Sequence, residues 1–95
     1  MKALVWTLEA LQDREAIYDY IEIDNPAAAI ALDERFAKKA ARLVDRPALG
    51  RPGRVAGTCE RIVHRRYIIV YDVDDVSVRM LRVLHAALQW PPRSS

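Results

Sequence analysis

The last third of the chain holds side chains that could cleave RNA without a metal ion. Glu60 and His64 lie four residues apart in a segment with strand character, so they would share one face of a sheet. A carboxylate and an imidazole could then act as general base and general acid, and Arg82 could stabilise the charge that develops on phosphorus. His85 is the fourth candidate, because it follows the same predicted strand as Arg82. Each candidate also has a structural alternative. Glu60 and His64 could be a polar pair on an edge strand, Arg82 could be held by a carboxylate, and His85 could serve in packing or capping.

Arginine dominates the basic residues of the second half. Residues 48–95 hold eight arginines, no lysine and four acidic residues, whereas residues 1–47 hold seven Lys or Arg and nine acidic residues. A basic half favours nucleic acid or an acidic protein segment as partner, because guanidinium groups match phosphate and carboxylate. A solvated basic face is the simpler alternative. The candidate target-binding or nucleic-acid-binding residues are Arg51, Arg54, Arg61, Arg65 and Arg79.

The composition argues against several other classes of protein. Cys59 is the single cysteine, and no Cys/His cluster has the spacing of a zinc site, so we expect no internal disulfide, no metal and no cofactor. The glycine-rich run lacks the Lys-Ser/Thr of a phosphate-binding P-loop. No apolar run reaches the ~18–20 residues that span a bilayer, and no signal-peptide pattern is visible. We therefore expect a cytoplasmic protein with no membrane partner.

The first half of the chain has the pattern of one strand followed by two helices. Residues 2–6 form a short apolar run, Thr7 can cap a following helix, and Asn25 with Pro26 can start a second helix. A short connection between two amphipathic helices predicts an antiparallel hairpin. Arg14 lies within the apolar stripe of the first helix, where it either meets a carboxylate or extends along the surface.

A glycine-rich segment separates the two halves of the chain. All three glycines, Gly50, Gly53 and Gly57, lie within eight residues. Glycine permits positive φ, and proline, which stands at position 52, fixes its own φ, so neither type continues a helix or a central strand. We therefore expect an irregular loop.

Three segments with a two-residue period follow the loop, at residues 59–65, 67–73 and 76–84. We expect an antiparallel meander, with the helical pair on one face and the N-terminal strand joined to the sheet. The uncovered face would then present arginines and histidines. Residues 85–90 are predicted to form a last turn or a short helix.

The order of elements is β-α-α-β-β-β, which defines an α+β fold. Ninety-five residues, 52% of them hydrophobic, suit one small domain at residues 1–91 with a tail at residues 92–95. Alternation along the last strand predicts a shared face for Val78, Met80, Arg82 and Leu84.

The chain resembles the RelE/ParE superfamily of bacterial toxins from type II toxin–antitoxin modules over about residues 3–91. The family's fold, a helical hairpin on an antiparallel sheet, is the fold expected above. The resemblance rests on the order and spacing of short motifs, namely Trp6 before a helix with Asp13 and Tyr20-Ile21, Asn25-Pro26-Ala27-Ala28-Ala29, Pro47, Gly50-Arg51-Pro52-Gly53-Arg54, Gly57-Thr58-Cys59-Glu60, Tyr67-Ile68-Ile69-Val70-Tyr71, and Leu81-Arg82-Val83-Leu84-His85 with Gln89-Trp90-Pro91.

The resemblance implies a growth-inhibiting toxin of a plasmid-stabilisation module, held inactive by a cognate acidic antitoxin in a hetero-oligomer. RelE-type members cleave mRNA in the ribosome, whereas ParE-type members poison DNA gyrase. RelE-like nucleases usually carry an arginine at the position of Ile68, and isoleucine cannot stabilise phosphorane charge, so the sequence favours ParE-like action. Many relatives have arginine at the position of Cys59. The alternatives are a ribosome-dependent mRNA endoribonuclease and an inactive protein that only binds its antitoxin.

Overall fold

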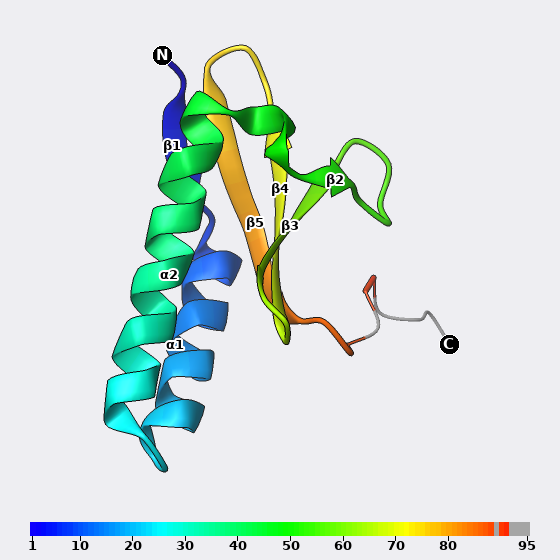
Figure 1. The fold of residues 1–95 in the computed structure, drawn as a ribbon. Helices are drawn as coiled ribbons and strands as arrows, with labels where there is room; N and C mark the ends of the chain where they lie inside the picture. The colour runs from blue at the N-terminus through cyan, green and yellow to red at the C-terminus, as the bar shows by residue number, and fades with distance from the viewer. Residues whose placement is uncertain (89, 92–95) are drawn as a thin grey trace.

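The computed structural model describes residues 1–88, 90 and 91. Within them the chain forms two helices and a five-stranded sheet, and the predicted α+β order is confirmed (Figure 1). The predicted tail at residues 92–95 lies outside the described residues. The elements in chain order are β1 (Ala3–Trp6), α1 (Leu8–Glu22), α2 (Pro26–Asp45), a 3-10 turn (Pro47–Leu49), β2 (Arg51–Pro52), β3 (Cys59–His64), β4 (Tyr67–Val73) and β5 (Ser77–His85).

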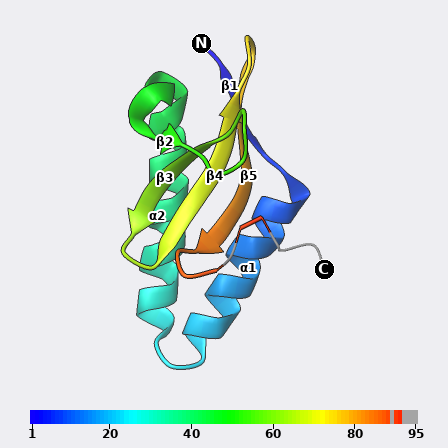
Figure 2. The same cartoon turned by 90° about the vertical axis from the view of Figure 1, so that its right-hand side faces the viewer.

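The strand order in the sheet is β1-β5-β4-β3-β2. Strands β3, β4 and β5 form the predicted antiparallel meander, and β1 pairs in parallel with β5 from Ala3 opposite Ser77 to Trp6 opposite Met80. The helical hairpin is the crossover between those two parallel strands, and both helices pack on the same side of the sheet (Figures 1 and 2). The glycine-rich loop contains the two-residue strand β2, which pairs with β3, so the prediction of a wholly irregular loop was wrong.

Local side-chain caps start both helices as the sequence predicts. The Thr7 hydroxyl accepts a hydrogen bond from the Ala10 amide at 3.1 Å, and the Asn25 side chain accepts one from the Ala28 amide at 3.1 Å. Pro26 occupies the first turn of α2. Each cap satisfies an amide that the first helical turn leaves without a partner.

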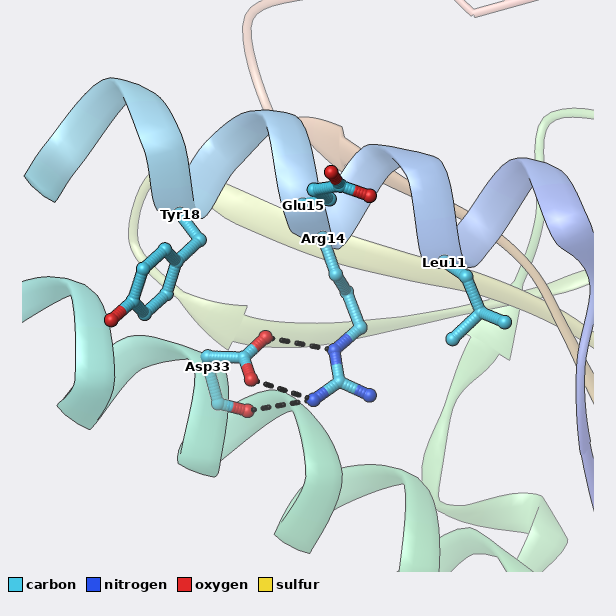
Figure 3. Close-up of a pocket in the computed structure, with 5 residues that line it drawn as sticks. All are labelled: Leu11, Arg14, Glu15, Tyr18 and Asp33. Carbon is cyan, nitrogen blue, oxygen red and sulfur yellow. Dashed lines mark hydrogen bonds and ion pairs between the residues drawn. The ribbon is translucent and has the colours of Figure 1, made fainter.

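An arginine ties the two helices together. Arg14 of α1 donates through Nε and Nη2 to the two carboxylate oxygens of Asp33 on α2, both at 2.9 Å, and its guanidinium lies 4.5 Å from the Trp6 ring centroid. Of the two alternatives that the sequence left open for Arg14, the structure shows the pairing with a carboxylate. Figure 3 shows this pair in a shallow pocket between the helices, and none of the predicted site residues lines that pocket.

The main core lies between the helices and the sheet. Its centre is Tyr71, which is fully buried, and the phenol donates a hydrogen bond to the Pro47 carbonyl at 2.6 Å and accepts one from the Gly50 amide at 2.9 Å. Burial raises the pKa of this phenol, because the ionised form would lose its hydration. The other buried members are Ala10, Phe36, Ala40, Leu43, Val63, Ile69, Val78, Met80 and Val83.

A second, smaller core covers the opposite face of the sheet. Ile68, Val70 and Leu84 are buried there, and residues 81, 86 and 90 pack against them. Figure 1 shows the chain that directly follows β5 on the side of the sheet away from the helices. The prediction of an uncovered face lined by arginines and histidines was therefore wrong. Residues 86 and 87 form a turn, as predicted for part of 85–90, while residue 89 lies outside the described residues.

Two irregularities interrupt the two-residue alternation of the strands. In the β4–β5 pairing Val70 lies opposite Arg82 while Tyr71 lies opposite Met80, so one extra residue of β5 sits between them. This bulge moves Arg82 and Leu84 away from the face of Val78 and Met80. The prediction that these four residues share one face of the sheet was therefore wrong. A second register shift lies between Ile62 and His64 in β3.

Candidate functional site

The glycine-rich loop is built around one buried carboxylate. The side chain of Glu60 on β3 is 1% exposed, and its Oε2 accepts a hydrogen bond from the Arg54 amide at 3.0 Å. Arg51 Nη2 lies 3.4 Å from Glu60 Oε1, and Arg54 Nε lies 3.7 Å from Oε2. The structure therefore brings three predicted site residues together, with Glu60 enclosed as the counter-ion of two arginines.

Close packing holds the backbone of this loop in one path. A Cβ at Gly50 would overlap the Tyr71 phenol, and a Cβ at Gly53 would overlap the Thr58 hydroxyl. The Gly53 amide donates to the Thr58 carbonyl at 2.8 Å, and the Thr58 hydroxyl donates to the Val55 carbonyl at 2.6 Å. Glycine is required at 50 and 53 because the loop passes too close to its neighbours for a side chain.

Arginines connect this loop and the helices to the C-terminal segment. Arg54 Nη1 donates to the Leu88 carbonyl at 3.4 Å. Arg82 lies 5.3 Å from the Trp90 ring centroid and donates to both carboxylate oxygens of Asp13 on α1, at 2.7 and 3.0 Å. The hydrogen bonds to Asp13 raise the pKa of the Arg82 guanidinium further, so it remains charged. Arg82 is thus an ion-paired arginine that fixes α1 against β5.

Glu60 and His64 do not share a face of the sheet. Glu60 lies opposite Val70, a member of the smaller core, whereas the register shift before His64 places that residue opposite Tyr67, which packs on the helix-side core. The prediction failed because a bulge reverses the alternation of the strand. The acid–base pair inferred from the spacing is therefore not assembled.

The two predicted histidines instead flank a tyrosine. The Tyr67 ring centroid lies 6.3 Å from that of His64 and 5.4 Å from that of His85. Each histidine accepts a hydrogen bond at Nδ1 from a backbone amide two residues later, at 3.2 and 3.1 Å. Beside Tyr67 and His85, a depression of about 480 Å³ lies between α1 and β5, and Tyr20 and Arg82 also line it. Sequence reasoning missed Tyr67, although its place at the start of a strand next to the Arg65–Arg66 turn was a usable signal.

The remaining predicted basic residues are dispersed. Arg79 pairs with the Asp72 carboxylate across β4 and β5, at 2.8 and 2.5 Å. Arg61 lies opposite Ile69, whose side chain belongs to the helix-side core, and Arg65 lies exposed in the turn between β3 and β4. The five predicted arginines therefore do not form one patch, and only Arg51 and Arg54 lie together.

Ile68 and Cys59, the two positions where the family resemblance leads one to expect an arginine, are enclosed. Ile68 is 2% exposed in the smaller core, and Cys59 packs against the helix-side core next to the fully buried Tyr71. Residue 59 therefore faces away from the surface that carries Arg51 and Arg54. Among residues 1–88, 90 and 91, no group of three metal-ligating side chains gathers, and neither helix is long and apolar enough to cross a membrane.

Comparisons with known proteins place this chain in one family. A family model described as the ParE toxin of the type II toxin–antitoxin system parDE matches residues 4–90. The protein Y4kP of Sinorhizobium fredii is 41% identical over 91 residues, which are 95% of this chain and 94% of the relative. Toxin RelE2 of Caulobacter vibrioides is 39% identical over 87 residues, which are 92% of this chain and 98% of the relative.

Solved structures agree with the family model. The chromosomal ParDE system from P. aeruginosa superposes with a TM-score of 0.80 at 26% identity, over 90% of this chain and 96% of that chain. The toxin–antitoxin complex RelBE2 from Mycobacterium tuberculosis shares the fold, with a TM-score of 0.63 at 24% identity over 88% and 96% of the two chains. The chain belongs to the ParE toxin family of type II toxin–antitoxin systems. It is a toxin of the ParE/RelE superfamily, as the sequence motifs predicted.

Proposed function

We propose that the chain is a growth-inhibiting toxin that acts on DNA gyrase in the manner of ParE. The observation that carries this proposal is the family match over residues 4–90, taken together with the closed face of the sheet around Ile68. The toxin would serve a plasmid-stabilisation module in the bacterial cytoplasm.

The environment of Ile68 supports gyrase over mRNA as the target. In the RelE-like nucleases this position usually carries an arginine, and here it carries an apolar side chain that is 2% exposed. Val70 and Leu84 surround it, and Trp90 packs against the cluster. A buried isoleucine offers no donor to a developing phosphorane, because charge stabilisation needs polar groups aimed at the reacting atoms.

A cognate acidic antitoxin is the proposed partner. The structures from P. aeruginosa and M. tuberculosis are described as a toxin–antitoxin system and a toxin–antitoxin complex. The outer surface of this chain exposes Leu8, Leu11 and Ile30 on the helices, and β1 lies at the edge of the sheet. An amphipathic segment that folds on binding could cover these helices and pair with the edge strand.

The decisive experiment compares two reactions with the same purified toxin. Gyrase supercoiling of relaxed plasmid is measured over a range of toxin concentrations, and cleavage of mRNA on stalled ribosomes is measured in parallel. We expect inhibition of supercoiling and no cleavage, and addition of the neighbouring gene's product should abolish the inhibition. Cleavage without inhibition would refute the gyrase proposal. Neither activity, with antitoxin binding retained, would mean an inactive antitoxin-binding protein.

The second candidate function is a metal-independent, ribosome-dependent mRNA endoribonuclease. The observation that favours it is the grouping of His64 and His85 around Tyr67, with Tyr67 and His85 lining a depression large enough for a nucleotide-sized group. Imidazoles are general acids and bases near neutral pH. If mRNA is cleaved, the pH–rate profile should change in His85→Ala or His64→Ala, whereas an unchanged profile would exclude both residues.

A further inference from the structure

Glu60 is a buried carboxylate that neither candidate reaction uses. Its side chain is 1% exposed and lies opposite Val70, on the face of the sheet away from the helices. Its two oxygens accept hydrogen bonds from different parts of the same loop, Oε1 from the Arg51 guanidinium and Oε2 from the Arg54 amide, and the Arg54 guanidinium forms an ion pair with Oε2 at 3.7 Å. A carboxylate this enclosed has no access to a substrate proton, so a role in positioning fits its surroundings better than acid–base chemistry.

The two arginines remain open to the surface while Glu60 holds them. The side chain of Arg51 is 56% exposed and that of Arg54 is 41% exposed. Each guanidinium carries five N–H donors and approaches Glu60 through one nitrogen, so donors remain on both. The loop backbone beneath them is fixed by Gly50, Gly53 and Thr58. Two cations this close to one carboxylate would repel one another without it.

We infer that Glu60 is a positioning residue that holds Arg51 and Arg54 as a rigid pair to receive an acidic side chain of the protein target. This inference rests on the proposed function, because it takes gyrase as the target. Fixing both side chains before binding removes the entropy that flexible arginines would lose in the complex. A pair of guanidinium forks at a fixed separation suits one carboxylate in particular.

The charges around the loop favour a protein carboxylate over a nucleic acid backbone. Glu60 already offsets one of the two positive charges, and the two arginines of β5, Arg79 and Arg82, are paired with Asp72 and Asp13. Binding along a nucleic acid backbone relies on several cations that each neutralise a phosphate. This face offers one net charge at a defined point, which matches a single acidic residue.

The substitution Glu60→Gln separates positioning from charge, because the two effects have opposite signs. It raises the positive charge of the loop by one, which would strengthen binding to any anion if charge alone mattered. If Glu60 positions the arginines, inhibition of gyrase should weaken at least fivefold and growth arrest should weaken with it. Asp75→Asn is the matched control, since it makes the same charge change in the exposed β4–β5 turn. It should leave both readouts unchanged.

A second measurement tests the positioning in the absence of any target. The Arg54 amide donates to Glu60, so in Glu60→Gln its hydrogen exchange should accelerate about tenfold relative to amides of α2. Arg51→Lys keeps the charge and loses the fork, and it should weaken inhibition as Glu60→Gln does, while Arg42→Lys on α2 serves as its control. This second variant keeps the inference testable if Glu60→Gln does not fold.

The possible outcomes are distinct. If the wild-type toxin does not inhibit gyrase, the proposed function fails, and growth arrest with hydrogen exchange still tests the role of Glu60. Stronger growth arrest in Glu60→Gln, or unchanged exchange at Arg54, would overturn the positioning role. The toxin could instead bind duplex DNA and no protein target, with Arg51→Ala reducing the slope of log affinity against log salt concentration by about 0.9. That result would overturn the inference, because the ligand of the arginine pair would then be a phosphate and not a carboxylate.

Discussion

Removal of one hydroxyl group from Tyr71 should destabilise the whole domain. The phenol joins β4 to the connection after α2 through hydrogen bonds to the Pro47 carbonyl and from the Gly50 amide, at 2.6 and 2.9 Å. Tyr71→Phe removes a single oxygen atom and keeps the ring, so the loss comes mainly from those two bonds and from the partners left unpaired. Each is worth about 1 kcal/mol net, and a buried group left without a partner costs about 1–3 kcal/mol. We expect about 2–4 kcal/mol in all.

Urea and thermal unfolding measure this loss directly. For a domain of this size a change of 1 kcal/mol shifts Tm by about 4–8 °C, so Tm should fall by at least about 8 °C. Tyr20→Phe is the matched control, because Tyr20 is 75% exposed and its variant should stay within about 0.5 kcal/mol of the wild type. If the two variants were equally stable, the hydrogen bonds of Tyr71 would not contribute as the geometry indicates.

Further predictions address ionisation, the smaller core and the junction of α1 with β5. Burial raises the pKa of Tyr71 above its unfolded value near 10.0. The stability that the protonated phenol contributes should therefore be complete below pH 10 and should be lost as the pH rises further. The urea midpoint of the wild type should fall over that range, and it should fall less in Tyr71→Phe. Hydrogen bonds lower the pKa of Asp74 below 3.8. The stability that its carboxylate contributes should be lost as the pH falls through the folded-state pKa, and acid titration of Asp74→Asn should not show this loss. Ile68→Arg buries a charge and should cost at least about 3 kcal/mol in urea unfolding, against about 1 kcal/mol for Ile68→Val. Asp13→Asn weakens the bidentate contact to Arg82 and should lower the free energy of unfolding by about 1–3 kcal/mol. A urea midpoint equal to that of the wild type would contradict this role.

The features that the sequence predicted well are local ones. Thr7 and Asn25 cap their helices through atoms three residues away, so the identity of a few neighbouring residues decides the structure. The β-branched and aromatic content of residues 67–73 and the turn after them likewise determine a strand and a hairpin. The pairing of Arg14 with a carboxylate was one of the two outcomes that its place in an apolar stripe predicted, the other being a side chain extended along the surface.

The features that the sequence did not predict depend on contacts between distant segments. The bulges near Leu81 and between Ile62 and His64 leave no mark in the periodicity, yet they decide which faces those strands present. The Glu60 network joins residues that are six and nine positions apart through a loop whose path depends on Tyr71. The cover over Ile68 comes from the far end of the chain, and strand alternation alone says nothing about it.

The parallel pairing of β1 with β5 has a consequence for the timing of synthesis. Residues 3–6 are made long before their partners at residues 77–80, so β1 cannot pair with β5 until the segment between them has been synthesised. At about 5–20 residues per second, the roughly 74 residues that separate Ala3 from Ser77 take about 4–15 s to translate. The helical hairpin is finished well before its sheet, and its apolar surface stays uncovered during that interval. A protein that captures the hairpin at this stage would meet the toxin before it is able to act.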